Sequence, residues 1–446
     1  MSAPEGAGGR GWRIEWWIRI VFGLSALATA ALAYRYHAQE QAEALHTQRA
    51  GWAPALLAAV LAALGGAAVL IRPQLGTAKR CWLMSAVAAV VFALGTGTVW
   101  QLVSGDDRTD TIVGAPLMKP ADADRYVREE LGPKPVRKIP TGVFIQGVKL
   151  TGPEEVQVNG YVWQHYDESV PRTSQGVAFP EAPDGYAGKE VYSFRRADGR
   201  LTKGWHFNLT LRQRFDYHRY PLDKQNVWLR MWTTSAFERE VLVPDLAGYP
   251  PWKPHAKYGL DEDIVSAGWS PYYTAFSYAR HNYNITFGGA DYRPGGSSGA
   301  TELYYNIGVS RLYKGPLIGK LLQSTFIAVV MFMALFVHTR DAKKHPRFGF
   351  STWTAISFAV SLLLVIVVDQ TDVREITGDT SMTYLEYFAI AQYILITGIF
   401  ANAILLGSDT RVPPLEWRDN LLPRLLYWPI LTGLFFAFTM LVFAFD

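Results

Sequence analysis

Three hydroxyl side chains recur at helical spacing inside a long apolar segment near the end of the chain. Thr354, Ser357 and Ser361 stand at positions i, i+3 and i+7, so in a helix they form a narrow polar stripe. Leu364 and Val368 continue the same face. Copies of such a helix around one axis would combine a wetted, hydroxyl-lined passage with an aliphatic constriction that can exclude water. The alternative is that each hydroxyl bonds back to its own helix, as hydroxyls in lipid usually do.

The residues that enzymes commonly use are not arranged for catalysis. The sequence contains no HExxH, P-loop or GxSxG motif, its nine His residues are scattered, and its single cysteine, Cys81, cannot form an intrachain disulfide. A GxGxxG match at residues 6–11 has no strand before it and predicts a flexible tail. The net charge of +4 is too small to favour nucleic acid as a partner. We therefore expect no enzyme, no metal site and no cofactor.

Seven apolar segments are each long enough to cross a bilayer core of about 30 Å, and they fall at the two ends of the chain. This division predicts an N-terminal module with three membrane helices at 1–104, an outer domain at 105–314 and a four-helix membrane domain at 315–446. The predicted spans cover roughly residues 16–35, 52–71, 82–103, 316–338, 350–369, 384–407 and 425–444.

Charged residues between the predicted spans favour a single orientation. Basic residues precede the first span and fill the loops after the second and fourth, whereas the turn after the fifth is mostly acidic. Because basic loops stay in the cytoplasm, we expect a cytoplasmic N-terminus, with the 105–314 domain and the C-terminus outside. Residues 20–33 also fit a secretory leader, and its cleavage would leave this topology unchanged.

The middle of the chain has the pattern of an all-β domain. Aromatic and β-branched runs of strand length alternate with clusters of Gly, Pro and Asp. Their partial alternation of apolar and polar residues predicts two sheets packed as a β-sandwich. The expected strands include residues 156–167, 191–201, 205–217, 226–232 and 302–313.

Five short motifs follow one another from residue 141 onward. RYPLDKQNVWL places Pro221, Asp223 and Gln225 in an aromatic-Pro-aliphatic-Asp-x-Gln turn, and TGVFIQGV precedes it. AGWSPYYTAF, NIGVSRLY and SMTYLEYF follow it. In this order, with four spans behind them, the motifs resemble the pentameric ligand-gated ion channels. Gln213 and Val227 stand where the eukaryotic members have cysteines, so the chain resembles the disulfide-free bacterial branch.

This resemblance implies a homopentamer in the bacterial inner membrane. Binding of a small molecule or a proton by the outer β domain would open a pore for ions, lined by the helix at 350–369. The family has four spans, so the resemblance does not account for the first three. A receptor of the same fold that does not conduct, and signals through the N-terminal helices, stays open as an alternative.

The resemblance also implies an electrostatic cluster where the outer domain meets the membrane. Pro221 and Asp223 would lie on its signature loop, Arg311 on the strand leaving the domain, and Glu154 or Glu155 on a neighbouring turn. An Arg shared by carboxylates in a partly dry interface can have two stable arrangements, which a switch requires. The alternative is that Asp223 caps its own turn and Arg311 anchors at the headgroups.

For the pore, the resemblance implies a lining by the hydroxyl stripe and the two aliphatic residues beyond it. Aligning the helix at Asp369 instead gives a second register. The inner mouth has basic residues and no carboxylate, which favours anions or poor selectivity. The second register comprises Thr352, Ile356, Ala359 and Leu363.

A ligand site is expected between subunits, where ring faces could hold an amine. Each aromatic residue considered for it could instead belong to the core. The candidates are Trp232, Phe179, Tyr161 and Tyr292.

Overall fold

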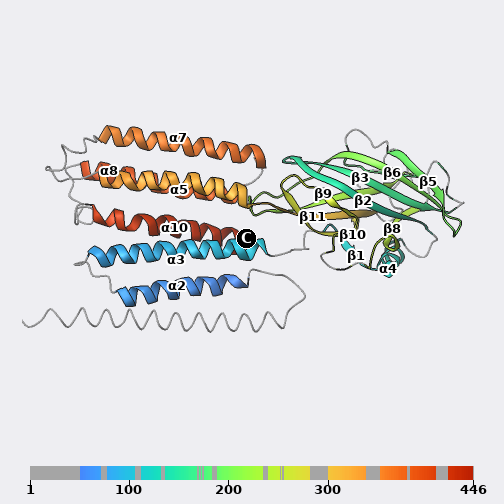
Figure 1. Cartoon of the computed structure of the whole chain (residues 1–446), viewed down its shortest axis with the longest axis horizontal. Coiled ribbons are helices and arrows are strands. Elements are labelled where there is room, and N and C mark those ends of the chain that lie inside the picture. The colour runs from blue at the N-terminus through green and yellow to red at the C-terminus, as the bar shows by residue number, and fades with distance from the viewer. Residues whose placement is uncertain are drawn as a thin grey trace, which may run out of the picture.

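The computed structural model places helices and sheets at opposite ends of an elongated molecule (Figure 1). The helices run side by side, and the sheets lie beyond one end of them. The structure describes residues 51–71, 78–105, 112–131, 136–167, 170, 172, 175–182, 188–234, 240–251, 253, 256–281, 300–337, 352–378, 382–407 and 420–444.

Within these residues, five helices are long and apolar enough to cross a membrane, which indicates a multi-pass membrane protein. The expectation of membrane helices combined with β structure is confirmed at this level. The first predicted span, 16–35, lies outside the described residues. The five helices are α2 (Trp52–Ile71), α3 (Ala78–Ser104), α5 (Lys314–Val337), α8 (Tyr384–Gly407) and α10 (Leu421–Ala444).

The segment predicted as the fifth span forms α7 (Thr352–Thr377), but the expected end at residue 369 is wrong. The helix continues to Thr377 and is followed by Gly378, which has a φ of +70° and donates its N–H to the Arg374 carbonyl at 2.8 Å. A glycine in this conformation is a common helix stop. The carboxylates expected in a turn, among them Asp372 and Glu375, are therefore helical. Their charges mark the end of the apolar segment but do not end the helix.

The helices are not arranged in chain order. α7 lies at one side of the bundle, α5 and α8 come next, and α10, α3 and α2 follow toward the other side (Figure 1). α3 packs against α10 on one flank and α2 on the other. α7, the helix predicted to line a pore, is thus at the opposite side of the bundle from α2 and α3.

Two sheets form the other end of the molecule. One has the order β1-β10-β11-β7-β4, and the other β5-β6-β3-β2-β8, with β9 paired to β2. Both sheets contribute to one apolar core, which includes Val158 and Phe207 from the second sheet and Leu229 and Ile307 from the first. The strands are β1 (Ala115–Leu117), β2 (Arg137–Gly152), β3 (Glu155–Tyr166), β4 (Val177–Ala178), β5 (Lys189–Arg195), β6 (Leu201–Arg212), β7 (Lys224–Thr233), β8 (Glu240–Pro244), β9 (Leu260–Val265), β10 (Trp269–His281) and β11 (Ala300–Arg311).

Two details of the expected all-β domain are wrong. The predicted strand at 191–201 is a hairpin, because Gly199 turns the chain at a φ of +83° between β5 and β6. The domain also contains a helix, α4 (Pro120–Leu131), which was not predicted. Its apolar residues Ala123 and Val127 are buried in the core that the two sheets share, so tertiary packing stabilises this short segment.

Candidate functional site at the junction of sheets and helices

The loop between β6 and β7 lies against the ends of the helices. Tyr217, Tyr220 and Leu222 are buried in the same apolar cluster as Leu317 of α5 and Tyr384 of α8. The Tyr220–Pro221 peptide bond is cis. The loop that the sequence analysis singled out is therefore packed directly on the helical part.

Gln225 closes the base of this loop. Its Nε2 donates to the Asp216 carbonyl at 2.6 Å, and its Oε1 accepts from the Asp216 N–H at 3.1 Å. The same Nε2 lies 3.0 Å from Oδ2 of Asp223. One amide side chain thus fixes both the start of the loop and the carboxylate at its end.

Asp223 and Arg311 form a bidentate ion pair at the point where β11 leaves the sheet. Arg311 donates from Nε to Oδ1 at 2.6 Å and from Nη2 to Oδ2 at 3.0 Å. The side chain of Asp223 is only 1% exposed and that of Arg311 is 14% exposed. Two parallel bonds to a buried carboxylate fix the guanidinium plane, because any rotation breaks at least one of them.

Aromatic rings surround the Arg311 guanidinium. Its central carbon lies 4.1 Å from the centre of the Trp269 ring, 4.8 Å from Tyr220 and 5.9 Å from Tyr217. Burial raises the pKa of Tyr217 to about 12, although the positive charge of Arg311 acts to lower it. Both tyrosines are therefore neutral at physiological pH and offer uncharged ring faces to the cation.

Two further contacts join the sheets to the helices. The Tyr384 N–H at the start of α8 donates to the His218 carbonyl at 2.8 Å, and His218 Nδ1 lies 2.9 Å from the Met382 carbonyl. At the end of α7, a Cβ added to Gly378 would lie 3.0 Å from Cβ of Pro153, in the turn between β2 and β3. Motion of the sheets would therefore reach α7 and α8 through two different turns.

The predicted junction residues are brought together in part. Pro221, Asp223 and Arg311 lie together, but neither Glu154 nor Glu155 pairs with Arg311 among the described residues. Glu155 lies 3.8 Å from Arg212 instead, and the Glu154 backbone carbonyl accepts from the Gln213 N–H. Strand β3 begins at Glu155, whose side chain lies near Arg212 of β6 on the sheet surface. The expected third carboxylate is therefore absent from the described surroundings of Arg311, where aromatic rings lie instead.

No protein-family model matches this chain, and no curated protein matches its sequence.

The predicted pore stripe lies on the side of α7 that faces away from the other described helices. Ser357 and Ser361 are exposed, as are Leu364 (64%) and Val368 (55%). On the opposite side, Ile366 is 1% exposed and packs in a cluster with α5, α8 and α10. Ser361 Oγ also donates to the Ser357 carbonyl at 2.9 Å, which is the local bond considered as the alternative. A serine hydroxyl that donates its hydrogen to its own helix still has oxygen lone pairs that can accept a hydrogen bond from outside.

The second register considered for the pore helix fits this arrangement less well. Ala359 packs against the other helices, and Leu363 is only 37% exposed. The side chains of Thr352, Thr354 and Ile356 lie outside the described part of α7.

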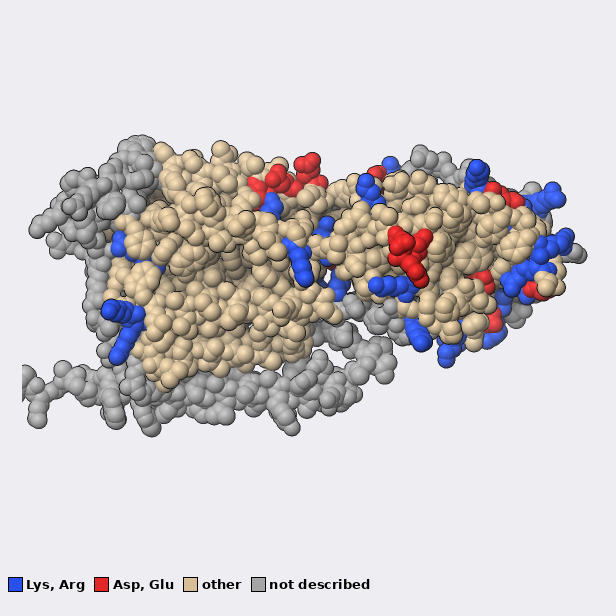
Figure 2. Space-filling model, in the orientation of Figure 1, with Lys and Arg blue, Asp and Glu red and all other residues tan. Residues whose placement is uncertain are grey.

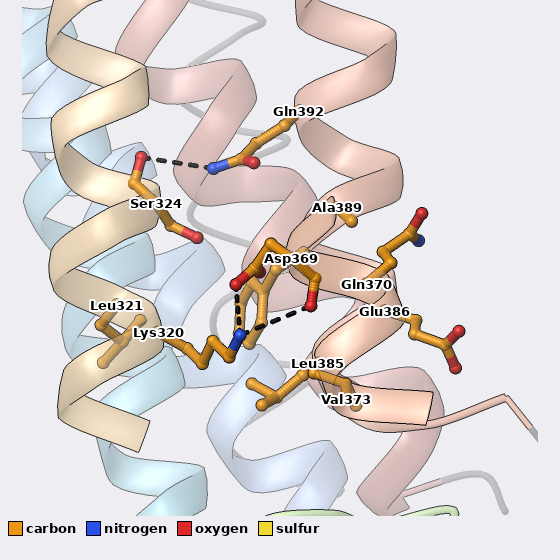
Figure 3. Close-up of a pocket in the computed structure, with 11 residues that line it drawn as sticks. Lys320, Leu321, Ser324, Asp369, Gln370, Val373, Leu385, Glu386, Ala389 and Gln392 are labelled. Atoms are coloured by element: carbon orange, nitrogen blue, oxygen red, sulfur yellow. Dashed lines mark hydrogen bonds and ion pairs between the residues drawn. The ribbon is translucent and has the colours of Figure 1, made fainter. Parts of the chain in front are cut away.

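A pocket between α5, α7 and α8 holds an ion pair at the end of the bundle nearest the sheets (Figure 3). Lys320 of α5 reaches Asp369 of α7, and both side chains are about three-quarters buried, with 25% and 24% exposed. Across the pocket, Gln392 Nε2 donates to the Ser324 carbonyl at 3.2 Å. The ion pair ties the outer part of α7 to α5, and the Gln392 bond ties α8 to the same helix.

The three described ligand candidates come from different parts of the sheets. Phe179 is 3% exposed and lies 5.4 Å from Phe207 in the core, so it is not available as a cage wall. Tyr161 is on β3 beside His206, in the other sheet from Trp232 on β7. Tyr292 lies outside the described residues.

A charged cluster around Trp232 was not predicted. Arg230 lies between Glu181 and Glu302, 3.4 Å from the latter, and the Trp232 indole donates to Glu302 at 2.6 Å. Burial raises the pKa of Glu181, and the charge of Arg230 acts against it. Arg230 faces Tyr304 across the β7–β11 pair, and Glu302 is two residues before Tyr304. The alternate spacing of these polar residues on two strands was a signal that could have been used.

Proposed function

We propose that this chain is one subunit of a homopentameric ligand-gated ion channel of the bacterial inner membrane. Its two sheets would form an outer β-sandwich, and α5, α7, α8 and α10 a four-helix pore domain. The observation that carries the proposal is the side of α7 on which Ser357, Ser361, Leu364 and Val368 lie. Copies of the chain around an axis at that side would line a passage with α7 and leave α2 and α3 at the rim.

The charge distribution supports the orientation. Basic side chains stand at the helix ends remote from the sheets, where α3 begins with Lys79 and Arg80, and carboxylates gather at the end of α7 near the sheets (Figure 2). By the positive-inside rule, the remote ends face the cytoplasm and the sheets lie outside.

The junction supports gating. A buried ion pair in an aromatic cage holds the strand that enters α5, and separate turns touch α7 and α8. A small displacement of the sheets would therefore be transmitted by direct contact to three helices of the proposed pore domain.

The test is water access to single cysteines in the full-length protein with Cys81 replaced by Ser. Ser361→Cys, Leu364→Cys and Val368→Cys should react with a charged thiol reagent, and reaction should change the current across a planar bilayer. Leu362→Cys and Ile366→Cys, on the packed side of the same helix turns, are the matched controls. Equal reactivity on both sides would reject α7 as the pore helix.

The alternative is a non-conducting receptor of the same fold. One observation favours this alternative: α3 contacts Tyr384, and Tyr384 in turn binds the junction loop, which is the β6–β7 loop at residues 213–223. A pentameric protein that binds a ligand but gives no current in planar bilayers would support this alternative. A monomer, dimer or trimer by native mass spectrometry in mild detergent would contradict both.

A further inference from the structure

The N-terminal helices are joined to the rest of the chain by close packing along α10. A Cβ added at Gly95 of α3 would lie 2.8 Å from the Phe436 ring of α10 and 3.2 Å from Val60 of α2. Val99, one turn further along α3, is completely buried. α3 therefore shares one apolar cluster with α10 and with the junction loop, in which Tyr220 is also buried.

At the outer end of α3, a chain of hydrogen bonds crosses three helices. Trp100 Nε1 lies 2.8 Å from the Tyr384 hydroxyl, which lies 2.7 Å from the Thr439 hydroxyl. Thr439 in turn donates to the Phe435 carbonyl at 2.6 Å. An indole N–H only donates and a carbonyl only accepts, so the direction of every bond in the chain is fixed. Trp100 donates to Tyr384, and Tyr384 donates to Thr439.

Tyr384 is also the residue that holds the junction loop. Its side chain is completely buried, and its backbone N–H donates to the His218 carbonyl. His218 is tied to the same loop by its own N–H, which donates to Asp216 at 2.9 Å. A change in the position of Tyr384 therefore moves a partner on α3, a partner on α10 and a partner in the loop.

We propose that Trp100 is a positioning residue through which the N-terminal helices hold Tyr384, and with it the loop at 213–223, in register. The N-terminal helices α2 and α3 then regulate the position of the junction loop. The effect of these helices on conduction rests on the proposed channel function, whereas their effect on the loop does not.

The experiment is hydrogen–deuterium exchange on the intact protein in nanodiscs, comparing Trp100→Phe with the unsubstituted chain. A lost buried hydrogen bond contributes about 1 kcal/mol, so amides of the loop and of the start of α8 should exchange about fivefold faster. In Tyr384→Phe the same amides should exchange faster, and adding Trp100→Phe should cause no further increase, because the two side chains act in one chain.

Ser85→Ala is the matched control. Ser85 Oγ donates to the Leu425 carbonyl at 2.5 Å, so this substitution also breaks a buried bond between α3 and α10. Ser85 lies 15 residues before Trp100, about 22 Å along the helix, and its loss should leave the loop unchanged. Faster exchange confined to α3, equal effects of Ser85→Ala on the loop, or full additivity with Tyr384→Phe would each overturn the proposal. A pentamer that carries no current, but whose loop amides exchange faster in Trp100→Phe, would reject the channel function and leave this proposal standing.

Discussion

Both oxygens of the Asp223 carboxylate accept hydrogen bonds from one edge of the Arg311 guanidinium, at 2.6 and 3.0 Å, and a face of that guanidinium lies against Trp269. Arg311 is thus held by two kinds of attraction with different directions. The carboxylate fixes it in the plane of the guanidinium, whereas the ring attracts it along the perpendicular.

Arg311→Ala is expected to destabilise the protein by about 3–5 kcal/mol, because it leaves the Asp223 carboxylate buried without its cation. Arg311→Met combined with Asp223→Asn should restore most of the thermal midpoint, since no buried charge is then left. The midpoint in detergent measures both effects. The restored double variant is also the proper protein for testing gating: if its open probability in bilayers equals that of the parent, the pair does not couple sheets to pore.

In the proposed channel, Glu375→Gln and Asp372→Asn should each reduce the preference for cations over anions. The extension of α7 places both carboxylates on the exposed side that carries Leu364 and Val368, where rings of negative charge would attract cations. The basic inner mouth in the sequence favoured anions or poor selectivity, but residues 338–350 lie outside the described part of the chain. Reversal potentials in a KCl gradient measure the preference. An anion-selective reversal potential in the parent protein would contradict the outer-ring argument.

Lys320→Met should lower the thermal midpoint, because Asp369 then keeps a partly buried carboxylate without its partner. The expected loss is about 1–3 kcal/mol. Adding Asp369→Asn should recover stability while freeing α7 from α5. A double variant as unstable as the single one would show that Lys320 stabilises the pocket by packing and not by its charge.

Asp245→Asn should lower stability at pH 7 and weaken its dependence on acid pH. Burial acts to raise the pKa of Asp245, but hydrogen bonds from His165 and Trp163, together with the nearby charges of His165 and Arg196, hold the pKa below its usual 3.8. A carboxyl with a depressed folded pKa stabilises the protein above its unfolded value, and this contribution is lost as pH falls through the folded pKa. Thermal midpoints between pH 3 and pH 7 measure it. Asp263, an exposed carboxylate, provides the control substitution.

The sequence predicted the elements whose pattern is local. Apolar runs gave the position of α2, α3, α5, α8 and α10 within a few residues, and the turn chemistry at Gly378 was overlooked because nearby charges suggested an earlier end. Pro221, Asp223 and Arg311 could be placed together only through the family resemblance. Trp269 and Tyr384 could not be assigned to the junction, because aromatic residues are abundant and only the folded register shows which ones meet a cation or a loop.

Phe436 and Met440 of α10 are buried in one apolar cluster with residues of α2 and α3, so protein covers a surface of α10 that acyl chains would otherwise solvate. In a bundle of four helices, lipid composition would act on that surface directly. Here lipid composition, chain length and lateral pressure can act on that face of α10 only through α2 and α3.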